Sequence, residues 1–237
     1  MNLAHSVFET LGWAVGYLLY RRQRLQSGDV IGSSRRRWVT AAAVLGALAG
    51  ARLLHLIEDP AQTVRFWTDP MFVAGGKTIV GGFIGAIIAV EVTKKRLGIT
   101  VPTGDVLAVP ICVGVAIGRV GCFLAGLADG TFGKATTLPW GVDFGDGVSR
   151  HPTQLYEIAF VLMLAGVLSA RRRQLAAVTG DAFKLAMVGY FLFRLAIDFL
   201  KPEVLWGGMS AIQWACLAAL AFYAPHVPRL LAEARHG

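Results

Sequence analysis

The stretch DVLAVPICVGVAIGRVGCFLA, residues 105–125, is long and apolar enough to cross a membrane as a single helix. It carries one arginine, Arg119, well inside the stretch and among glycines. A guanidinium at membrane depth costs about 3 kcal/mol even on the lenient insertion scales, so Arg119 needs an anionic partner. Asp105, at the start of the same stretch, is too distant, because fourteen residues of helix span about 21 Å. The stretch therefore predicts that Arg119 meets a substrate phosphate or a buried carboxylate.

Two further arginines stand in comparably apolar surroundings, Arg52 in residues 38–57 and Arg194 in YFLFRLAID, residues 190–198. Arg52 lies near the end of its stretch, where its side chain can reach lipid headgroups or a substrate. Arg194 is four residues before Asp198, a spacing that lets the two pair along one helix face, with Tyr190 on the same face. A structural salt bridge and a substrate contact both remain open for Arg194.

The composition indicates a membrane protein throughout. Apolar residues make up 55% of the chain and charged residues only 16%, with a mean hydropathy of +0.56. Soluble domains carry about 25% charged residues. We therefore expect an all-α membrane protein, a single polytopic membrane domain over residues 1–237. Its seven transmembrane helices are predicted at about 3–20, 38–57, 72–92, 105–125, 153–170, 182–200 and 209–226.

Basic residues gather on one side of these seven segments. Positive charge marks the cytoplasmic side, so the N-terminus is predicted outside and the C-terminus in the cytoplasm. The net charge of +8 then reflects topology, and no nucleic-acid partner is expected. The first segment has no basic start and ends in arginines, which is typical of a retained helix. The basic clusters are Arg21, Arg22 and Arg24; Arg35–Arg37; Lys94–Arg96; and Arg171–Arg173, with Lys184, Arg229 and Arg235 on the same side.

The three cysteines do not suggest disulfides or metal binding. Cys112 and Cys122 lie in one predicted helix and Cys216 in another, and the odd number without a Cys-rich loop argues against a zinc site. Buried cysteines of this kind are usually inert small hydrophobes, and we take that view of Cys122 although it lies near Arg119. No metal and no cofactor are expected.

The longest outward loop, at about 126–151, is rich in glycine and aromatic residues and predicts turns and short strands. It ends in RHPTQLYE, residues 150–157. Pro152 suits the first turn of the next helix, which places His151 at the helix mouth. Gln154 and Glu157, three residues apart, then share one inward face.

Several motifs of this chain have the order and spacing of the motifs of a known family. The chain resembles the prolipoprotein diacylglyceryl transferases, membrane enzymes that move the diacylglyceryl group of phosphatidylglycerol onto a cysteine thiol of a lipoprotein precursor. The motifs are Gly50-Ala51-Arg52, Gly81-Gly82-Phe83-Ile84-Gly85, Asp105, Gly118-Arg119-Val120-Gly121, residues 150–157, the face of Tyr190, Arg194 and Asp198, and Met209-Ser210 with Gln213.

The resemblance implies an enzyme of the bacterial inner membrane whose active site faces the outer side. Its partners would be phosphatidylglycerol, a lipoprotein precursor with a lipobox cysteine, and membrane lipid. Arg119 and Arg194 would stabilise the departing phosphate, and His151 is the histidine best placed to act as a base. Expected substrate-binding residues are Arg52, Gly81, Gly82, Gln154, Glu157, Tyr190, Asp198 and Gln213.

Four positions depart from the family pattern, and they keep other functions open. Val80 stands where the family has a histidine credited with helping to deprotonate the acceptor thiol, and Cys122 stands where it has asparagine. Leu127 replaces an acidic residue and Asp198 a glutamate. A phospholipid-binding membrane protein without transfer activity is therefore a second hypothesis, and a small-solute channel or transporter is a third.

Overall fold

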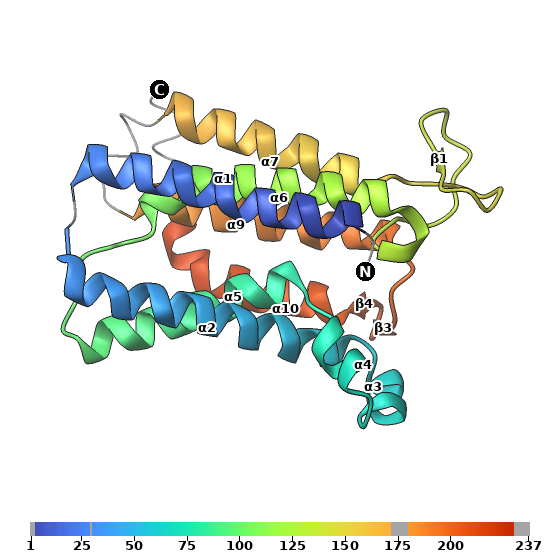
Figure 1. The fold of residues 1–237 in the computed structure, drawn as a ribbon, viewed down its shortest axis with the longest axis horizontal. Helices are drawn as coiled ribbons and strands as arrows, with labels where there is room; N and C mark the ends of the chain where they lie inside the picture. Colours follow the sequence, from blue (N-terminus) through green and yellow to red (C-terminus); the bar gives the residue numbers. More distant parts are fainter. Residues whose placement is uncertain (1–2, 29, 172–179, 230–237) are drawn as a thin grey trace. The chain divides into compact units, whose positions relative to one another are not determined.

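The computed structural model describes residues 3–28, 30–171 and 180–229, and these residues are overwhelmingly α-helical (Figure 1). They form two compact units. The first unit comprises Met1–Gly28, Pro102–Pro202 and Pro225–Gly237, and the second comprises Asp29–Val101 and Glu203–Ala224. Of the predicted cytoplasmic charges, Arg172, Arg173 and Arg235 lie outside the described residues.

The first unit contains the four helices α1 (Leu3–Ser27), α6 (Asp105–Ala125), α7 (Thr153–Ala170) and α9 (Asp181–Ile197). Helix α6 packs against the other three helices, and its most extensive interface is with α1. Glycines permit that approach: a Cβ atom at Gly12 would lie 2.7 Å from the carbonyl oxygen of Gly114. At the other end of the contact, a Cβ at Gly121 would lie 2.8 Å from the Cβ of Phe8. Small residues at such contacts are typical of helix pairs in membranes.

Asp105 connects α6 to the start of α9. Its carboxylate accepts hydrogen bonds from the backbone nitrogens of Gly180 and Phe183, the latter at 3.0 Å. Side-chain oxygens satisfy the unpaired N–H groups of a helix start in this way. Asp105 is therefore a capping residue, in agreement with the expectation that it is too far away to pair with Arg119.

The second unit contains α2 (Ser33–Glu58), α5 (Ile79–Arg96) and α10 (Ala211–Tyr223), with the short helices α3 (Pro60–Phe66) and α4 (Pro70–Gly75). Helices α2 and α5 pack backbone to backbone. A Cβ at Gly50 would lie 2.2 Å from the carbonyl oxygen of Gly81, and a Cβ at Gly85 would lie 2.1 Å from that of Gly46. Each helix thus presents two glycines four residues apart, the spacing that brings membrane helices closest.

Each of the seven predicted segments overlaps a helix, but three differ in detail. The segment 182–200 ends in a 3-10 turn at Asp198–Leu200, and the segment 209–226 contains only the 13-residue helix α10 between a short strand and a 3-10 turn. The predicted segment 72–92 is interrupted, because α4 ends at Gly75 and α5 begins only at Ile79. Thr78 explains the new start, since its hydroxyl accepts a hydrogen bond from the nitrogen of Gly81 at 3.1 Å and caps α5. Among the described helices, three stretches are long and apolar enough to cross a membrane, namely Ser33–Glu58, Asp105–Asp129 and Thr153–Ala170.

The 126–151 loop has the predicted short strands. It begins with the 3-10 helix η1 (Gly126–Asp129) and contains the antiparallel pair β1 (Val142–Asp143) and β2 (Ser149–Arg150), with Val142 opposite Arg150. Asp143 closes the hairpin, because its carboxylate accepts hydrogen bonds from three successive backbone nitrogens, Gly145 to Gly147. In the second unit, β3 (Leu205–Trp206) and β4 (Met209–Ser210) form another hairpin before α10.

Two further 3-10 helices complete the described chain. Helix η2 (Asp198–Leu200) continues from α9, and η3 (Ala224–His226) follows α10. Because η2 follows α9 directly, the polar face of α9 extends to Asp198 and Lys201. Both of these side chains are buried.

Candidate functional site

The partner of Arg119 is a carboxylate on the neighbouring helix. Nη2 of Arg119 on α6 lies 3.0 Å from Oε2 of Glu157 on α7, and both side chains are almost completely buried. The sequence predicted a substrate phosphate or a buried carboxylate for this arginine, and the structure contains the carboxylate. Helices α6 and α7 are therefore joined by an ion pair in the interior of the first unit.

Glu157 also binds two residues of α9. The hydroxyl of Tyr190 donates a hydrogen bond to Oε1 of Glu157 at 2.7 Å. Nη1 of Arg194 lies 3.8 Å from Oε2, the oxygen that Arg119 contacts. One carboxylate thus holds side chains of α6 and α9 from α7, which confirms that Glu157 faces inward.

Arg194 is held by a second carboxylate, Asp198. Nη2 and Nε of Arg194 donate to Oδ1 of Asp198 at 2.8 and 3.2 Å, so the salt bridge that the four-residue spacing left open is present. Nζ of Lys201 lies 4.0 Å from the same oxygen. Burial lowers the pKa of Lys201 to about 8, and the nearby charges of Arg194 and Arg119 act in the same direction. We call Arg119, Arg194, Lys201, Glu157 and Asp198 the arginine cluster.

The arginine cluster has an excess of positive charge. Three cations, Arg119, Arg194 and Lys201, face two carboxylates, Glu157 and Asp198, which leaves one positive charge while Lys201 is protonated. An uncompensated buried charge is expensive, and an anionic ligand is the group that balances it.

Several buried polar atoms of the arginine cluster and of Gln154, one turn before Glu157 on α7, have no hydrogen-bond partner among the described residues. They are Nε of Arg119, Oδ2 of Asp198 and both amide atoms of Gln154. Gln154 is only 1% exposed. Leaving a buried donor or acceptor unpaired costs about 1–3 kcal/mol, so these atoms are available to a polar ligand or to water. The cluster thus combines an unpaired guanidinium donor on Arg119 with an unpaired carboxylate oxygen on Asp198.

His151 lies at the helix mouth, as predicted, just before α7. Its Nδ1 is 3.3 Å from the hydroxyl of Tyr156, which also accepts a hydrogen bond from Nε1 of Trp140 at 2.8 Å. Its backbone carbonyl accepts from the nitrogen of Gly133, which ties the loop to the helix. In the described contacts His151 pairs with Tyr156 and not with a residue of the arginine cluster. Its role as a base stays a prediction.

The remaining predicted substrate-binding residues belong to the second unit, where each has a packing or capping role. Arg52 donates a hydrogen bond to the carbonyl of Gly76. Gly81 packs against Gly50, and Gly82 is buried in α5. Gln213 forms a capping box with Ser210 at the start of α10. Substrate contact by these four residues stays a prediction. Val80, where the family pattern has histidine, is fully buried.

Two features of the first unit escaped the sequence analysis. Lys201 was missed, although its spacing of three residues from Asp198 places it at the end of the face that was recognised. His5 was not among the residues that the sequence singled out, yet its Nδ1 lies 2.9 Å from Oδ1 of Asp129. No local signal connects these two residues, because they lie in distant segments.

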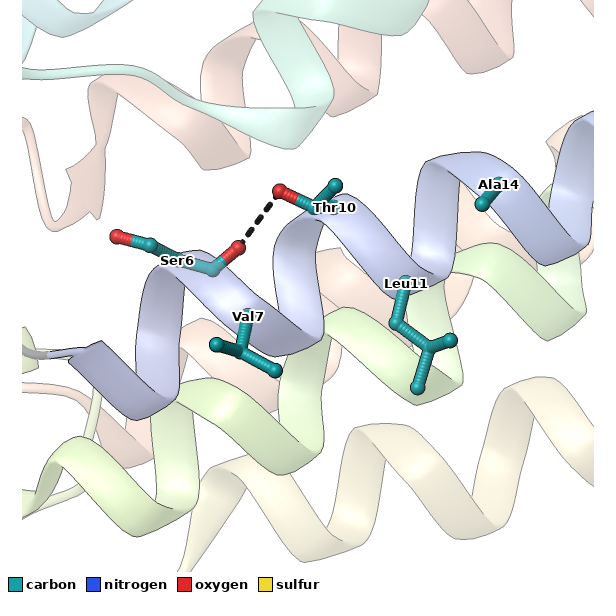
Figure 2. A pocket seen from close by; sticks show the side chains of 5 residues that line it. All are labelled: Ser6, Val7, Thr10, Leu11 and Ala14. Atoms are coloured by element: carbon teal, nitrogen blue, oxygen red, sulfur yellow. Dashed lines mark hydrogen bonds between the residues drawn. The ribbon is translucent and has the colours of Figure 1, made fainter.

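A shallow pocket follows His5 on α1, lined by Ser6, Val7, Thr10, Leu11 and Ala14 (Figure 2). The hydroxyl of Thr10 donates to the carbonyl of Ser6 at 2.8 Å. None of the lining side chains is ionisable, so this pocket carries no group that could take part in proton transfer or charge stabilisation.

The comparisons with known proteins agree with the geometry. The prolipoprotein diacylglyceryl transferase family matches residues 4–225. The chain is 31% identical over 225 residues to a phosphatidylglycerol–prolipoprotein diacylglyceryl transferase of Nitratidesulfovibrio vulgaris, covering 89% of this chain and 81% of the relative. It is 30% identical over 239 residues to the protein of that name from Nitrosomonas europaea, with 92% and 81% covered. The Bordetella bronchiseptica protein of that name is 31% identical over 230 residues, with 89% and 84% covered.

A family match over residues 4–225, relatives that are 30–31% identical over about 90% of the chain, and helices of membrane-spanning length lead to one conclusion: this chain belongs to the prolipoprotein diacylglyceryl transferase family of membrane enzymes.

Proposed function

We propose that this protein transfers the diacylglyceryl group of phosphatidylglycerol to the cysteine thiol of an exported lipoprotein precursor and releases glycerol phosphate. The names of the relatives describe this activity for those proteins. The observation that carries the proposal for this chain is the arginine cluster, a buried site with an excess positive charge and unpaired polar atoms.

In the proposed reaction the thiol sulfur attacks a glyceryl carbon, so that a C–S bond forms and a C–O bond to the phosphate breaks. The electron pair of that bond leaves with glycerol phosphate, and the thiol proton is lost. Negative charge therefore grows on a phosphate oxygen. Guanidinium groups stabilise such an oxygen through paired, charge-assisted hydrogen bonds, most strongly where water is scarce. Arg119 and Arg194 are assigned this role.

Glu157 and Asp198 are positioning residues in this proposal. Each holds an arginine from one side, which fixes the guanidinium plane and leaves the remaining N–H groups for the ligand. Nε of Arg119 is such a group. Lys201 supplies the additional positive charge for the phosphate. Gln154, buried with an unpaired amide, is assigned to a polar part of the lipid headgroup.

The thiol can ionise with modest help. A thiol with an ordinary pKa near 8.5 is already a few per cent thiolate at neutral pH. His151, at the mouth of α7, is proposed as the base that assists it. Replacing His151 by Asn tests this role, since loss of a general base typically lowers the rate about 10²- to 10⁴-fold. An unchanged rate would show that the thiol ionises without it.

The membrane arrangement belongs to the same proposal. Seven helices would cross the inner membrane with the N-terminus outside, and phosphatidylglycerol would enter sideways from the bilayer. The acceptor cysteine would approach from the outer side under the 126–151 loop. Arg52, Gly81, Gly82 and Gln213 are proposed to contact the lipid. Supporting this arrangement are the distribution of basic residues and the three membrane-length helices.

The deciding experiment incubates purified protein in nanodiscs with headgroup-labelled phosphatidylglycerol and a lipobox peptide. We expect released glycerol phosphate and a peptide heavier by one diacylglyceryl group. Replacing Arg119 or Arg194 by Ala should abolish both products. Arg119→Lys should form them only weakly, because an ammonium group cannot make the two parallel hydrogen bonds of a guanidinium. Arg65→Ala, which removes an exposed arginine on α3, is the matched control and should remain active.

The outcome can also favour the alternative function. If phosphatidylglycerol copurifies with the protein but neither product forms, with the lipobox peptide or with other thiols, the protein binds phospholipid without transfer. Solute flux in liposomes that survives Arg119→Ala would instead indicate a channel or transporter.

A further inference from the structure

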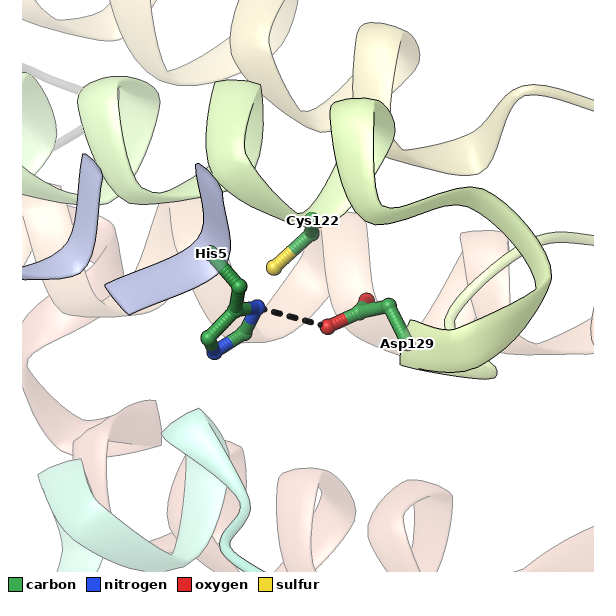
Figure 3. A group of neighbouring side chains, drawn as sticks. All are labelled: His5, Cys122 and Asp129. Atoms are coloured by element: carbon green, nitrogen blue, oxygen red, sulfur yellow. Dashed lines mark ion pairs between the residues drawn. The ribbon is translucent and has the colours of Figure 1, made fainter. Parts of the chain in front are cut away.

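Three side chains of different chemistry meet at one end of the first unit, His5, Cys122 and Asp129 (Figure 3). They come from the start of α1, the end of α6 and η1, and the figure shows them pointing toward one another. One donor atom from each lies within 4.8 Å of the other two. Nδ1 of His5 is 2.9 Å from Oδ1 of Asp129. An imidazole nitrogen, a thiol sulfur and a carboxylate oxygen are the ligand types that bind zinc.

Packing of the two helices holds this group in place. A Cβ at Gly121 would lie 3.3 Å from the Cα of His5, so only a glycine lets α1 come this close to α6. The side chain of Asp129 is 6% exposed, and Cys122 is buried. The three donors are therefore in a largely enclosed site on helices that approach backbone to backbone.

Each donor also has an outer partner that fixes its orientation. Nε2 of His5, the ring nitrogen away from Asp129, lies 3.6 Å from Oε2 of Glu9. The other carboxylate oxygen of Asp129 accepts a hydrogen bond from the hydroxyl of Thr131. Sγ of Cys122 accepts from Nη1 of Arg119 at 3.8 Å. Metal-binding histidines nearly always have such a carboxylate or carbonyl partner on the second nitrogen, and ligating carboxylates are likewise hydrogen-bonded.

We propose that His5, Cys122 and Asp129 bind a divalent transition-metal ion, with zinc as the ion that suits these donors. A thiolate and a carboxylate supply two negative charges that balance the ion, and a neutral imidazole completes the set. Two ligands about 2.0 Å from a tetrahedral ion lie about 3.3 Å apart, so Nδ1 of His5 and Oδ1 of Asp129 need to separate only slightly. The ion replaces the proton that these two atoms share.

The neighbouring charges are compatible with a cation. Arg119, the cation beside Cys122, is neutralised on its other side by Glu157 at 3.0 Å. Glu9, one turn along α1, adds a carboxylate next to His5. The sequence analysis expected no metal because the cysteines have no ligand spacing. The site combines a single cysteine with donors from distant segments, which spacing alone does not detect.

Three protein ligands leave the fourth position of a tetrahedral ion open, the arrangement of zinc sites that bind a substrate. We infer that this position takes the thiol of the acceptor cysteine, which gives up its proton to the proposed base, His151, when it coordinates the ion. This second step rests on the proposed function. It is supported by the contact between Cys122 and Arg119, which links one of the three ligands to the arginine cluster.

Cobalt(II) is the probe for the metal site, because it replaces zinc and its bond to a thiolate gives a charge-transfer absorption. Chelator-treated protein is titrated with cobalt and then with zinc. We expect the absorption to appear, to be abolished by Cys122→Ser and by displacement with zinc, and to persist in Cys112→Ser, which removes another buried cysteine of α6. The affinity for cobalt should fall at least tenfold in His5→Gln and in Asp129→Asn. Size-exclusion profiles of all four variants verify that they are folded.

Absence of the absorption in the wild-type protein, or its persistence in Cys122→Ser, overturns the metal site. If Cys122→Ser does not fold, unchanged cobalt affinity in both His5→Gln and Asp129→Asn overturns it equally.

A second titration tests the open position. Adding the lipobox peptide to the cobalt protein should increase the charge-transfer absorption, because a second thiolate coordinates, whereas a peptide with serine in place of the cysteine should not. No difference between the peptides overturns the role toward the acceptor. Failure of the transfer assay with an intact cobalt spectrum overturns the proposed function instead, so the two failures are distinguishable.

Discussion

Glu157 is the residue on which the arginine cluster depends, because it compensates Arg119 and also binds Tyr190 and Arg194. Helical spacing indicated that Glu157 faces inward and showed that Arg194 can pair with Asp198, without deciding between that pair and a substrate contact. It did not identify Glu157 as the partner of Arg119, because that contact joins two helices and depends on how they pack. The same limit applies to His5 and Asp129.

Replacing Glu157 by Gln should strongly destabilise the protein. Removing one member of a buried ion pair leaves an uncompensated charge and costs about 3–5 kcal/mol. Tyr190→Phe removes only one hydrogen bond to that charged carboxylate and should cost about 1.5–3 kcal/mol. Thermal unfolding in detergent should therefore rank the wild-type protein above Tyr190→Phe, and Tyr190→Phe above Glu157→Gln. Equal unfolding temperatures for Glu157→Gln and the wild type would mean that the pair is not buried as described.

Lys201 should make anion binding sensitive to pH. Its pKa of about 8 lies below the ordinary value for lysine because burial disfavours the charged form. Below pH 8 the side chain is protonated and contributes to phosphate binding, and this contribution is lost as the pH rises through 8. Calorimetry with glycerol phosphate should show weaker binding across this range.

The matched variant Lys201→Gln should bind glycerol phosphate with the affinity of the high-pH form at every pH.

The lowered pKa of Lys201 also makes the free energy of unfolding depend on pH. The unfolded chain binds more protons than the folded one between pH 8 and the ordinary lysine value, so stability should rise with pH over this range. If Lys201→Gln still shows the same pH dependence of binding and of stability, a group other than Lys201 causes it.

At the level of the elements, a helix in each of the seven apolar segments was predictable from length and hydropathy, and three of these helices are of membrane-spanning length. The interruption at residues 76–78 was not predicted, since a run of glycines is equally compatible with close helix packing. The hydroxyl of Thr78 caps α5, so a new helix begins at Ile79 instead of one continuous helix. Short helices such as α3, which begins after Asp59 with Pro60, have too few residues for a periodic signal.

The close contact between α2 and α5 should not tolerate a methyl group. A Cβ at Gly85 would lie 2.1 Å from a backbone oxygen of α2, so Gly85→Ala should force the helices apart and lower the unfolding temperature. Gly166 in α7 is the control, because a Cβ there meets nothing within 4 Å. Gly166→Ala should be neutral or stabilise the protein by up to about 1 kcal/mol through helix propensity. Equal effects of the two substitutions would contradict the packing described.

For the whole molecule, the distribution of basic residues predicts one orientation in the membrane, with the N-terminus outside. Reporter fusions test it directly. A reporter that works only in the cytoplasm should be active at the C-terminus and inactive within the 126–151 loop, while an export-dependent reporter should give the opposite pattern. Activity of the cytoplasmic reporter in the loop would reverse the topology and would place the proposed acceptor route on the wrong side.

The ion pair between Arg119 and Glu157 also has a consequence for how the protein is made. Synthesis delivers α6 before α7, so Arg119 reaches the membrane while its carboxylate is still on the ribosome. A lone guanidinium is disfavoured in lipid. Helix α6 should therefore wait at the insertion machinery until α7 emerges, and the two should enter the bilayer together as a hairpin. Truncated chains that stop before Thr153 should be released into the membrane less efficiently than chains that extend past Ala170.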